Sequence, residues 1–361
     1  MAQIKNISII GLGLIGGSIA KALKASDNNF VISAFDQKPE VIKTALSENI
    51  IDNAFTDISE ALNSDLIFLC LPTDASLEIF SKLIPSLKPQ TIISDVCGVK
   101  SIFEEKWTEV NSEGHYIGGH PMTGKEVGGY ENSDAQLFDN SIYILSKFSE
   151  SCPRIIEFLK IIEILGAKHI YLYPDLHDKV VARVSHLPQL LSIALINSLG
   201  ENKEGINFLD YAAGGFRDMT RIASSPFSNW KSILDHNREE IITAIEFLQH
   251  NMIKIEDLIQ QADFEKLDNL FSEARLKREK IAKNSKGFIN PLFDVYFQLN
   301  DTPGSLSEVL LLLLKNSLNV KDIELQKYNE KSGGVFRISF NKGVEAITAK
   351  NVLSEAGYKL R

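Results

Sequence analysis

Three glycines near the start of the chain, Gly11, Gly13 and Gly16, have the spacing G-x-G-x-x-G, and an acid, Asp36, follows 20 positions after the last of them. The apolar run 6–10 leads into the glycines, and a helical pattern and a second apolar run separate them from the acid. In a strand–turn–helix unit of this kind, the glycines allow the backbone to approach a pyrophosphate, which the amino end of the helix binds. The acid accepts hydrogen bonds from ribose hydroxyls and repels a 2′-phosphate. These residues therefore predict a site for NAD rather than NADP.

Further candidate contacts to this cofactor follow from the same pattern. Leu14 and Ile15 lie between the second and third glycines, and two buried-strand runs end at Leu71-Pro72 and at Asp95. In an open α/β sheet, ligands bind beyond the carboxyl ends of the strands. We therefore expect all five residues to line the cofactor site.

A histidine in a glycine-rich loop is the candidate catalytic group. His120 follows the apolar run 115–117, within the loop 118–129, and has a glycine before it and a proline after it. Such a backbone can lie close to a ligand, and an imidazole suits a base beside a nicotinamide because its pKa lies near neutral pH. The alternative is a surface or capping histidine without a catalytic role.

The elements that would position these residues fall into three expected domains. Residues 1–172 alternate strands and helices, which predicts a doubly wound α/β sheet of the Rossmann type. Residues 173–286 are helical almost throughout, with long segments at 176–199, 229–261 and 264–282 and an expected kink at Pro188. Residues 287–361 have the order β-α-β-β-α-β, which predicts a small ferredoxin-like α+β domain that ends in a strand at 358–360.

Composition excludes several classes of protein. The 361 residues are 44% hydrophobic and carry a formal net charge of −9, and no run of Lys or Arg stands out, so nucleic acid and membrane surfaces are not expected partners. Cys70, Cys97 and Cys152 lack metal-ligand spacing and are odd in number, so we expect free thiols and no metal. No signal peptide is apparent, and we expect a cytoplasmic location.

Several separated motifs resemble the signature of the prephenate dehydrogenase family, and the resemblance covers roughly residues 5–280. They are Gly118-Gly-His-Pro-Met-Thr-Gly-Lys-Glu126 with Gly128-Gly129, Val184-Ser-His-Leu-Pro188, Gly214-Gly-Phe-Arg-Asp-Met-Thr-Arg-Ile-Ala223, Ser225-Pro226 and Trp230. Residues 291–361 resemble an ACT domain, an amino-acid-sensing module, in strand order and in the turn 301–306.

The resemblance implies oxidative decarboxylation of prephenate to 4-hydroxyphenylpyruvate with reduction of NAD. It places His120 on the 4-hydroxyl of the substrate and Arg221 on a carboxylate, which a forked guanidinium can bind through two hydrogen bonds. It also implies feedback by tyrosine, or by phenylalanine, at the ACT-like domain, and we expect a homodimer.

Other candidate substrate residues follow from their positions. Asp218 lies three residues before Arg221, so it would orient that side chain if the segment is one helix; the alternative is a surface ion pair. His186 contacts either the substrate or a domain interface, or is simply a buried histidine. His177 lies nine positions before His186, about half a turn out of phase at ~100° per residue, so we leave it out of the site.

The remaining candidates each have two interpretations. Glu126 would gate the site or pair with Arg221, or is a solvated loop acid, and Trp230 would wall the pocket or lie in the core. Where many family members have a serine that hydrogen-bonds the substrate hydroxyl and the catalytic histidine, this chain has Gly98. Where some have a second histidine, it has Gln189, which can still hydrogen-bond the side chain of a keto acid but cannot supply positive charge.

Three alternatives to prephenate dehydrogenase remain at this stage. An arogenate or dual-substrate cyclohexadienyl dehydrogenase differs only in the side chain that it accepts. A 3-hydroxyacid or imine reductase shares the two-domain plan but not the motifs. A protein of another class would be an amino-acid sensor with a catalytically silent core.

Overall fold

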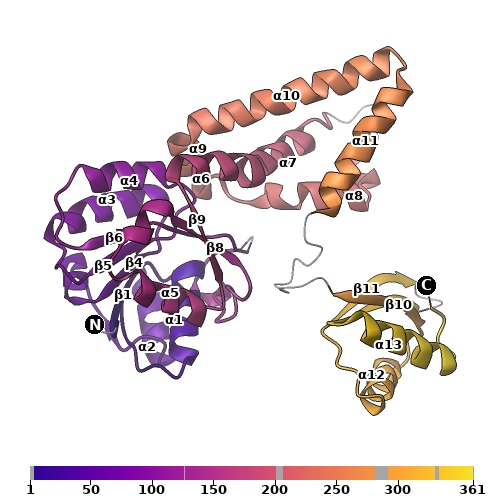
Figure 1. The fold of residues 1–361 in the computed structure, drawn as a ribbon, viewed down its shortest axis with the longest axis horizontal. Coiled ribbons are helices and arrows are strands. Elements are labelled where there is room, and N and C mark those ends of the chain that lie inside the picture. Colours follow the sequence, from indigo (N-terminus) through magenta and orange to yellow (C-terminus); the bar gives the residue numbers. More distant parts are fainter. Residues whose placement is uncertain (1–3, 126, 201–205, 281–291, 330–332, 361) are drawn as a thin grey trace. The chain divides into compact units, whose positions relative to one another are not determined.

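The computed structural model describes residues 4–125, 127–200, 206–280, 292–329 and 333–360. The chain forms two compact units, Met1–Asp263 and Phe264–Arg361, each of which is described by itself below (Figure 1).

A six-stranded parallel sheet with the order β3-β2-β1-β4-β5-β6 is the centre of the first unit. Its strands are β1 (Asn6–Ile10), β2 (Val31–Phe35), β3 (Asn53–Ala54), β4 (Leu66–Leu69), β5 (Ile92–Asp95) and β6 (His115–Ile117). This is the strand order of a Rossmann fold, in which the ligand crevice lies where the order reverses, between β1 and β4. The predicted doubly wound sheet is therefore confirmed.

Helices cover both faces of this sheet, because alternate strand residues point to opposite sides. Ile7 and Ile9 share a core with α1 (Leu14–Ala25), α2 (Pro39–Ser47) and α5 (Ile155–Ile164). Ile67 and Leu69 share the other core with α3 (Thr73–Leu83) and α4 (Ser101–Thr108). Short helices η1 (Ile58–Asn63), η2 (Ile84–Ser86), η3 (Tyr130–Asn132) and η4 (Lys147–Ser151) complete the connections.

A second, three-stranded sheet was not expected. It consists of β7 (Gly119–Pro121), β8 (Ile142–Ser146) and β9 (Lys168–Leu172), with β7 antiparallel and β9 parallel to β8. The two later apolar runs therefore do not extend the doubly wound sheet. His120 lies on β7, opposite Ile144, and not in a loop as its glycine-rich surroundings suggested.

The rest of the first unit is helical. Residues 174–197 comprise α6 (Pro174–Val181), a π-helical turn η5 (Ala182–His186) and α7 (Leu187–Asn197), so the irregularity expected at Pro188 takes the form of a π turn before it. The predicted segment 229–261 is divided at Asn237. The elements after α7 are η6 (Phe208–Tyr211), α8 (Gly214–Thr220), η7 (Arg221–Ser224), η8 (Phe227–Asn229), α9 (Lys231–His236) and α10 (Arg238–Gln260).

The helical stretch Pro174–Asn197 is, by length and composition alone, apolar enough to cross a membrane. Such a stretch is weak evidence for a span, since core helices of soluble proteins have the same property. In the structure it carries the buried polar side chains of His177, Asp178 and Gln189.

The second unit contains α11 (Phe264–Glu279) and a small α+β fold. The fold runs β10 (Phe293–Leu299), α12 (Ser305–Lys315), β11 (Asp322–Asn329), β12 (Gly333–Phe340) and α13 (Gly343–Glu355), and its antiparallel sheet has the order β10-β12-β11. The final strand predicted at 358–360 is reduced to a single bridge between Leu360 and Phe297. The element order otherwise matches the prediction.

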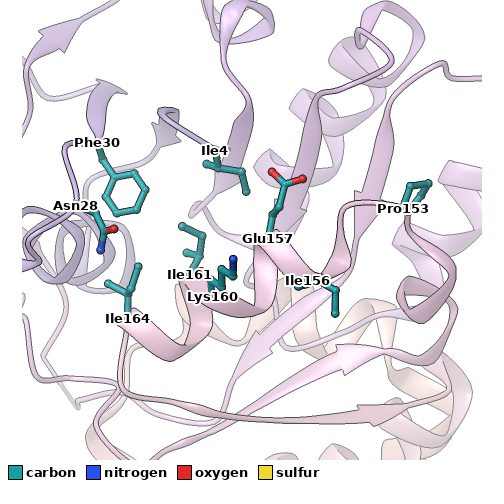
Figure 2. Close-up of a pocket in the computed structure, with 9 residues that line it drawn as sticks. All are labelled: Ile4, Asn28, Phe30, Pro153, Ile156, Glu157, Lys160, Ile161 and Ile164. Atoms are coloured by element: carbon teal, nitrogen blue, oxygen red, sulfur yellow. The ribbon is translucent and has the colours of Figure 1, made fainter. Parts of the chain in front are cut away.

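A pocket of about 490 Å³ lies between α5 and the segments that lead into β1 and β2 (Figure 2). It is lined by Ile4, Asn28, Phe30, Pro153, Ile156, Glu157, Lys160, Ile161 and Ile164. It is therefore at the amino ends of these parallel strands, whereas ligands of this fold bind at the carboxyl ends.

Candidate active site

The turn after β1 fits a dinucleotide. Gly11 has a φ of +98°, and a Cβ on Gly16 would come within 1.9 Å of the Gly11 carbonyl oxygen, so both positions require glycine. A Cβ on Gly13 would meet no atom within 4 Å, which leaves open space in front of this backbone. No side chain caps the amino end of α1 and its first turn holds no acid, so the end is suited to a pyrophosphate.

Asp36 is held beside this turn. Its carboxylate accepts hydrogen bonds from the backbone N–H of Leu12 at 2.8 Å and of Lys38 at 2.9 Å, and the residue is half-buried at the end of β2. An oriented carboxylate at this position suits the ribose hydroxyls of NAD. Leu14 and Ile15, in the first turn of α1, are half-buried, as is Leu71, whereas Pro72 is exposed before α3.

Asp95 differs from its expected role. Its side chain is fully buried and forms an ion pair with Lys100, while it accepts hydrogen bonds from the Tyr116 hydroxyl at 2.8 Å and the Cys97 N–H at 3.0 Å. The sequence pattern located the strand end correctly, but the carboxylate points into the protein because it balances the buried ammonium group of Lys100. We therefore remove the Asp95 side chain from the cofactor contacts.

His120 belongs to a hydrogen-bonded group with His177 and Asp178, although the sequence analysis left His177 out of the site. Its Nδ1 lies 2.8 Å from Nε2 of His177, and Nδ1 of His177 lies 2.8 Å from Oδ1 of Asp178. Burial lowers the pKa of His120 well below its usual value, and the nearby His177, Lys100 and His186 lower it further. His120 is therefore neutral near pH 7 and can accept a proton.

The exclusion of His177 from the site was wrong. It assumed a straight α-helix from His177 to His186, whereas η5 makes a π turn between them, with its i→i−5 bond from the Leu187 N–H to the Ala182 carbonyl. A π turn takes more residues per turn, so it rotates the chain less per residue than an α-helix does. His177 contacts His120 from α6, and His186, after the π turn, is close enough to affect the pKa of His120.

Gly98 lies directly beside the catalytic candidate. A Cβ at this position would be 3.8 Å from both Nε2 and Cε1 of His120 and 3.7 Å from Cδ1 of Ile233 on α9. These are ordinary contact distances, so the space that the family's serine would fill exists in this chain. The Nε2 atom of His120 therefore faces the Gly98 backbone without a side chain between them.

His186 and Trp230, from the helical part of this unit, contact each other. Their rings make an edge-to-face contact with centroids 6.0 Å apart, and Nδ1 of His186 lies 3.2 Å from the Asn237 amide nitrogen. Burial lowers the pKa of His186 to about 4, so this histidine is also neutral near pH 7. Trp230 is half-buried at the start of α9.

Three of the remaining substrate candidates lie on α7 and on the helices after it. Arg221 and Asp218 are exposed, and α8 ends at Thr220, so the single helical face expected for the pair is interrupted where η7 begins. Gln189 is buried and donates its amide N–H to the Ile222 carbonyl at 3.0 Å, which ties α7 to η7. Glu126 lies outside the described residues.

A dinucleotide-binding turn with a proton-accepting imidazole at the same sheet edge is what an NAD-dependent dehydrogenase requires. Comparison with known proteins agrees. The family model "Prephenate dehydrogenase, nucleotide-binding domain" matches residues 19–171, and "Prephenate dehydrogenase, dimerization domain" matches residues 173–273. The chain belongs to the prephenate dehydrogenase family.

Individual relatives support this assignment. The prephenate dehydrogenase of Bacillus subtilis is 31% identical over 346 residues, which cover 94% of this chain and 93% of the relative. The cyclohexadienyl dehydrogenase of Zymomonas mobilis is 31% identical over 283 residues, 77% of this chain and 96% of the relative. The crystal structure of Aquifex aeolicus prephenate dehydrogenase with hydroxyphenyl propionate and NAD+ is 30% identical, with a TM-score of 0.70 over 78% of this chain and 99% of that one.

Proposed function

We propose that this protein catalyses the NAD-dependent oxidative decarboxylation of prephenate to 4-hydroxyphenylpyruvate. The observation that carries the proposal is the neutral imidazole of His120, whose Nε2 faces the Gly98 backbone beyond the carboxyl end of β5. Bound NAD supplies the acceptor for the two electrons and the hydrogen that leave C4. The glycine turn and Asp36 hold the cofactor, with the preference for NAD that an acid at this position confers.

The protein's part in the reaction is to accept a proton and to orient the substrate. Nε2 of His120 takes the proton of the C4 hydroxyl as C4 is oxidised. Loss of CO2 then aromatises the ring, and the proton returns to the ring oxygen, so the enzyme ends in its starting state. Arg221 binds a substrate carboxylate, a role that rests on the family motif around it.

A second substrate is a specific alternative, because the Zymomonas mobilis relative is a cyclohexadienyl dehydrogenase. Arogenate carries an ammonium group where prephenate carries a keto group. The glycine turn and the contact of His120 with His177 argue against the alternative of an amino-acid sensor with a catalytically silent core.

Regulation by tyrosine at the C-terminal fold belongs to the same proposal. The β-α-β-β-α order of residues 293–355 supports an ACT-like domain. The Bacillus subtilis relative aligns over 94% of the chain, so the alignment must extend beyond residue 286 into this domain. A pocket of about 150 Å³ at the turn after β10 is a candidate effector site, lined by Leu299, Asn300, Asp301, Thr302, Ser305, Leu306, Leu325, Gly334 and Phe336.

A homodimer and a cytoplasmic location complete the proposal. The matched family model is named for dimerization, and α10 exposes large apolar side chains at Phe247, Met252 and Ile253, which a partner subunit would cover. Light scattering of the purified protein tests the first part.

The catalytic part is tested by His120→Asn. An amide cannot accept the proton as a base, so we expect kcat with prephenate to fall by about 10²–10⁴-fold. His169→Asn, at an exposed position on β9, is the matched control and should retain activity. A near-normal kcat in the His120 variant would remove this residue from the role of base.

A further inference from the structure

His177 and Asp178, which lie next to His120 in a chain of hydrogen bonds, have no role in the reaction as described so far. His177 is fully buried, and its ring meets that of His120 edge-to-face at a centroid distance of 5.1 Å. The 2.8 Å contact between Nδ1 of His120 and Nε2 of His177 joins the strand β7 to the helix α6. The adjacent 2.8 Å contact to Asp178 extends the chain of hydrogen bonds to a carboxylate.

Asp178 is anchored on the opposite side from His177. Its carboxylate accepts the backbone N–H of Lys100 at 2.8 Å and of Ser101 at 2.9 Å, at the amino end of α4, and its own carbonyl accepts a hydrogen bond from Asn237 at 2.9 Å. Burial by itself raises the pKa of Asp178, but the hydrogen bonds from His177 and Ser101 outweigh it and leave the pKa below its usual value. The carboxylate is therefore ionised, and it can only accept protons in these hydrogen bonds.

This ionised carboxylate determines where each proton in the chain lies. Because Asp178 only accepts, Nδ1 of His177 carries the proton between them. Burial lowers the pKa of His177, so its ring is neutral and its Nε2 is a bare acceptor. Nδ1 of His120 must then donate to it, which leaves Nε2 of His120 unprotonated on the side of Gly98.

We propose that His177 and Asp178 are positioning residues, which hold His120 in the Nδ1-protonated tautomer and in the orientation that presents a bare Nε2 to the substrate hydroxyl. This inference rests on the proposed role of His120 as the base. Hydrogen bonding at one ring nitrogen is the usual means by which a protein selects the reactive nitrogen of a histidine. Here the carboxylate acts through an additional imidazole.

His177 and Asp178 also stabilise the positive charge that forms on His120 during turnover. When Nε2 takes the substrate proton, His120 becomes an imidazolium, and Nδ1 keeps its donor contact to His177. Lys100, whose charge lowers the pKa of His120, is itself paired with the carboxylate of Asp95. The carboxylate of Asp178, hydrogen-bonded to Nδ1 of His177, is the anion at the end of this chain of hydrogen bonds.

The test compares two replacements of His177. Phenylalanine keeps a ring but cannot accept a hydrogen bond, whereas the amide oxygen of glutamine can take the place of Nε2. We expect His177→Phe to lower kcat by about 10²-fold, less than the about 10⁴-fold that a fixed wrong tautomer causes in serine proteases. His177→Gln should recover kcat to within about tenfold of the wild type, with KM for prephenate and Kd for NAD changed by less than about threefold in both variants.

A second readout does not depend on activity. Long-range ¹H–¹⁵N spectra of the wild-type protein with ¹⁵N-labelled histidine report which ring nitrogen of each neutral imidazole carries the proton, and the signals of His120 are assigned by their loss in His120→Asn. We expect Nδ1–H for His120. An Nε2–H tautomer in the wild type would overturn the proposal whatever the variants do.

The matched control is His236→Phe, since His236 also pairs with a carboxylate, that of Asp74 at 2.8 Å, but does not contact His120. It should leave kcat and the tautomer of His120 unchanged. A His177→Phe variant with normal kcat would refute the positioning role while leaving His120 as the base. If the wild-type protein itself fails to oxidise prephenate, the proposed function fails, and the tautomer measurement still decides the inference.

Discussion

The atom on which the proposed chemistry depends is Nε2 of His120. Sequence reasoning could find this residue because glycine and proline neighbours mark a backbone that approaches a ligand. It could not find His177 or Asp178, because the contact of His177 with His120 depends on how α6 packs against β7, which no helical period predicts. It also misjudged Asp95, since the partner that buries this carboxylate, Lys100, is recognisable only once the loop between them is folded.

The two glycines near His120 differ in what they allow. An added Cβ at Gly98 makes only ordinary contacts, so we expect Gly98→Ala to change the free energy of unfolding by less than about 1 kcal/mol. At Gly119 the Cβ would lie 2.8 Å from Cε1 of Tyr143 and 2.9 Å from the Asp95 carbonyl oxygen, which is backbone and cannot move aside cheaply. Gly119→Ala should therefore cost about 1–3 kcal/mol. Urea denaturation of both variants checks this, and equal stability losses would contradict it.

Asp36 decides the cofactor in this account. Replacing it with alanine removes the acceptor for the ribose hydroxyls and the repulsion of a 2′-phosphate, so we expect Asp36→Ala to narrow the ratio of kcat/KM between NAD and NADP. Steady-state kinetics with both cofactors measure the ratio. An unchanged ratio would show that Asp36 does not determine the preference for NAD.

At the scale of elements, the helix α6 and the π turn η5 carry histidines that are neutral in the fold. Burial lowers the pKa values of His177 and His186, the latter to about 4, whereas an unfolded histidine titrates near ~6.5. Below that pH the unfolded chain binds more protons than the folded one, so stability is fully present above pH ~6.5 and is lost as the pH falls toward ~4. His186 alone accounts for up to about 3 kcal/mol of this loss.

Denaturation midpoints at about pH 7.5, 6 and 5 test this expectation. The midpoint should fall steadily over the range, and His186→Gln, which has no titrating group at this position, should show a shallower fall. A midpoint that stays constant for the wild type from pH 7.5 to 5 would mean that these imidazoles are not buried in neutral form.

The periodicity of apolar residues predicted the bounds of single strands well, because these bounds depend mainly on the local sequence. The run 293–299 alternates apolar residues and forms β10 over the same residues, and the strand at 115–117 also has the predicted bounds. Assignment of strands to sheets failed for 142–146, because an apolar run does not specify its partner. β8 pairs with β7 and β9 and not with β6, a choice that long-range packing makes.

At the scale of the whole molecule, the two compact units suggest a separable regulatory part. Unit 1 has cores of its own, so we expect a protein that lacks residues 287–361 to retain NAD-dependent turnover and to lose inhibition by tyrosine. Kinetics of the truncated and full-length proteins, each with and without tyrosine, measure both effects. Inhibition that persists after truncation would place the effector elsewhere. The division into domains at 172 and 286 itself stays a prediction.

The central claim is tested most directly by following NADH formation by the purified protein with prephenate and with arogenate, using NAD and NADP in turn. We expect prephenate with NAD to give the highest kcat/KM, with 4-hydroxyphenylpyruvate and CO2 formed in equal amounts to NADH. Turnover of arogenate alone would contradict the assigned substrate, and the absence of NADH in every combination would contradict the proposed enzyme.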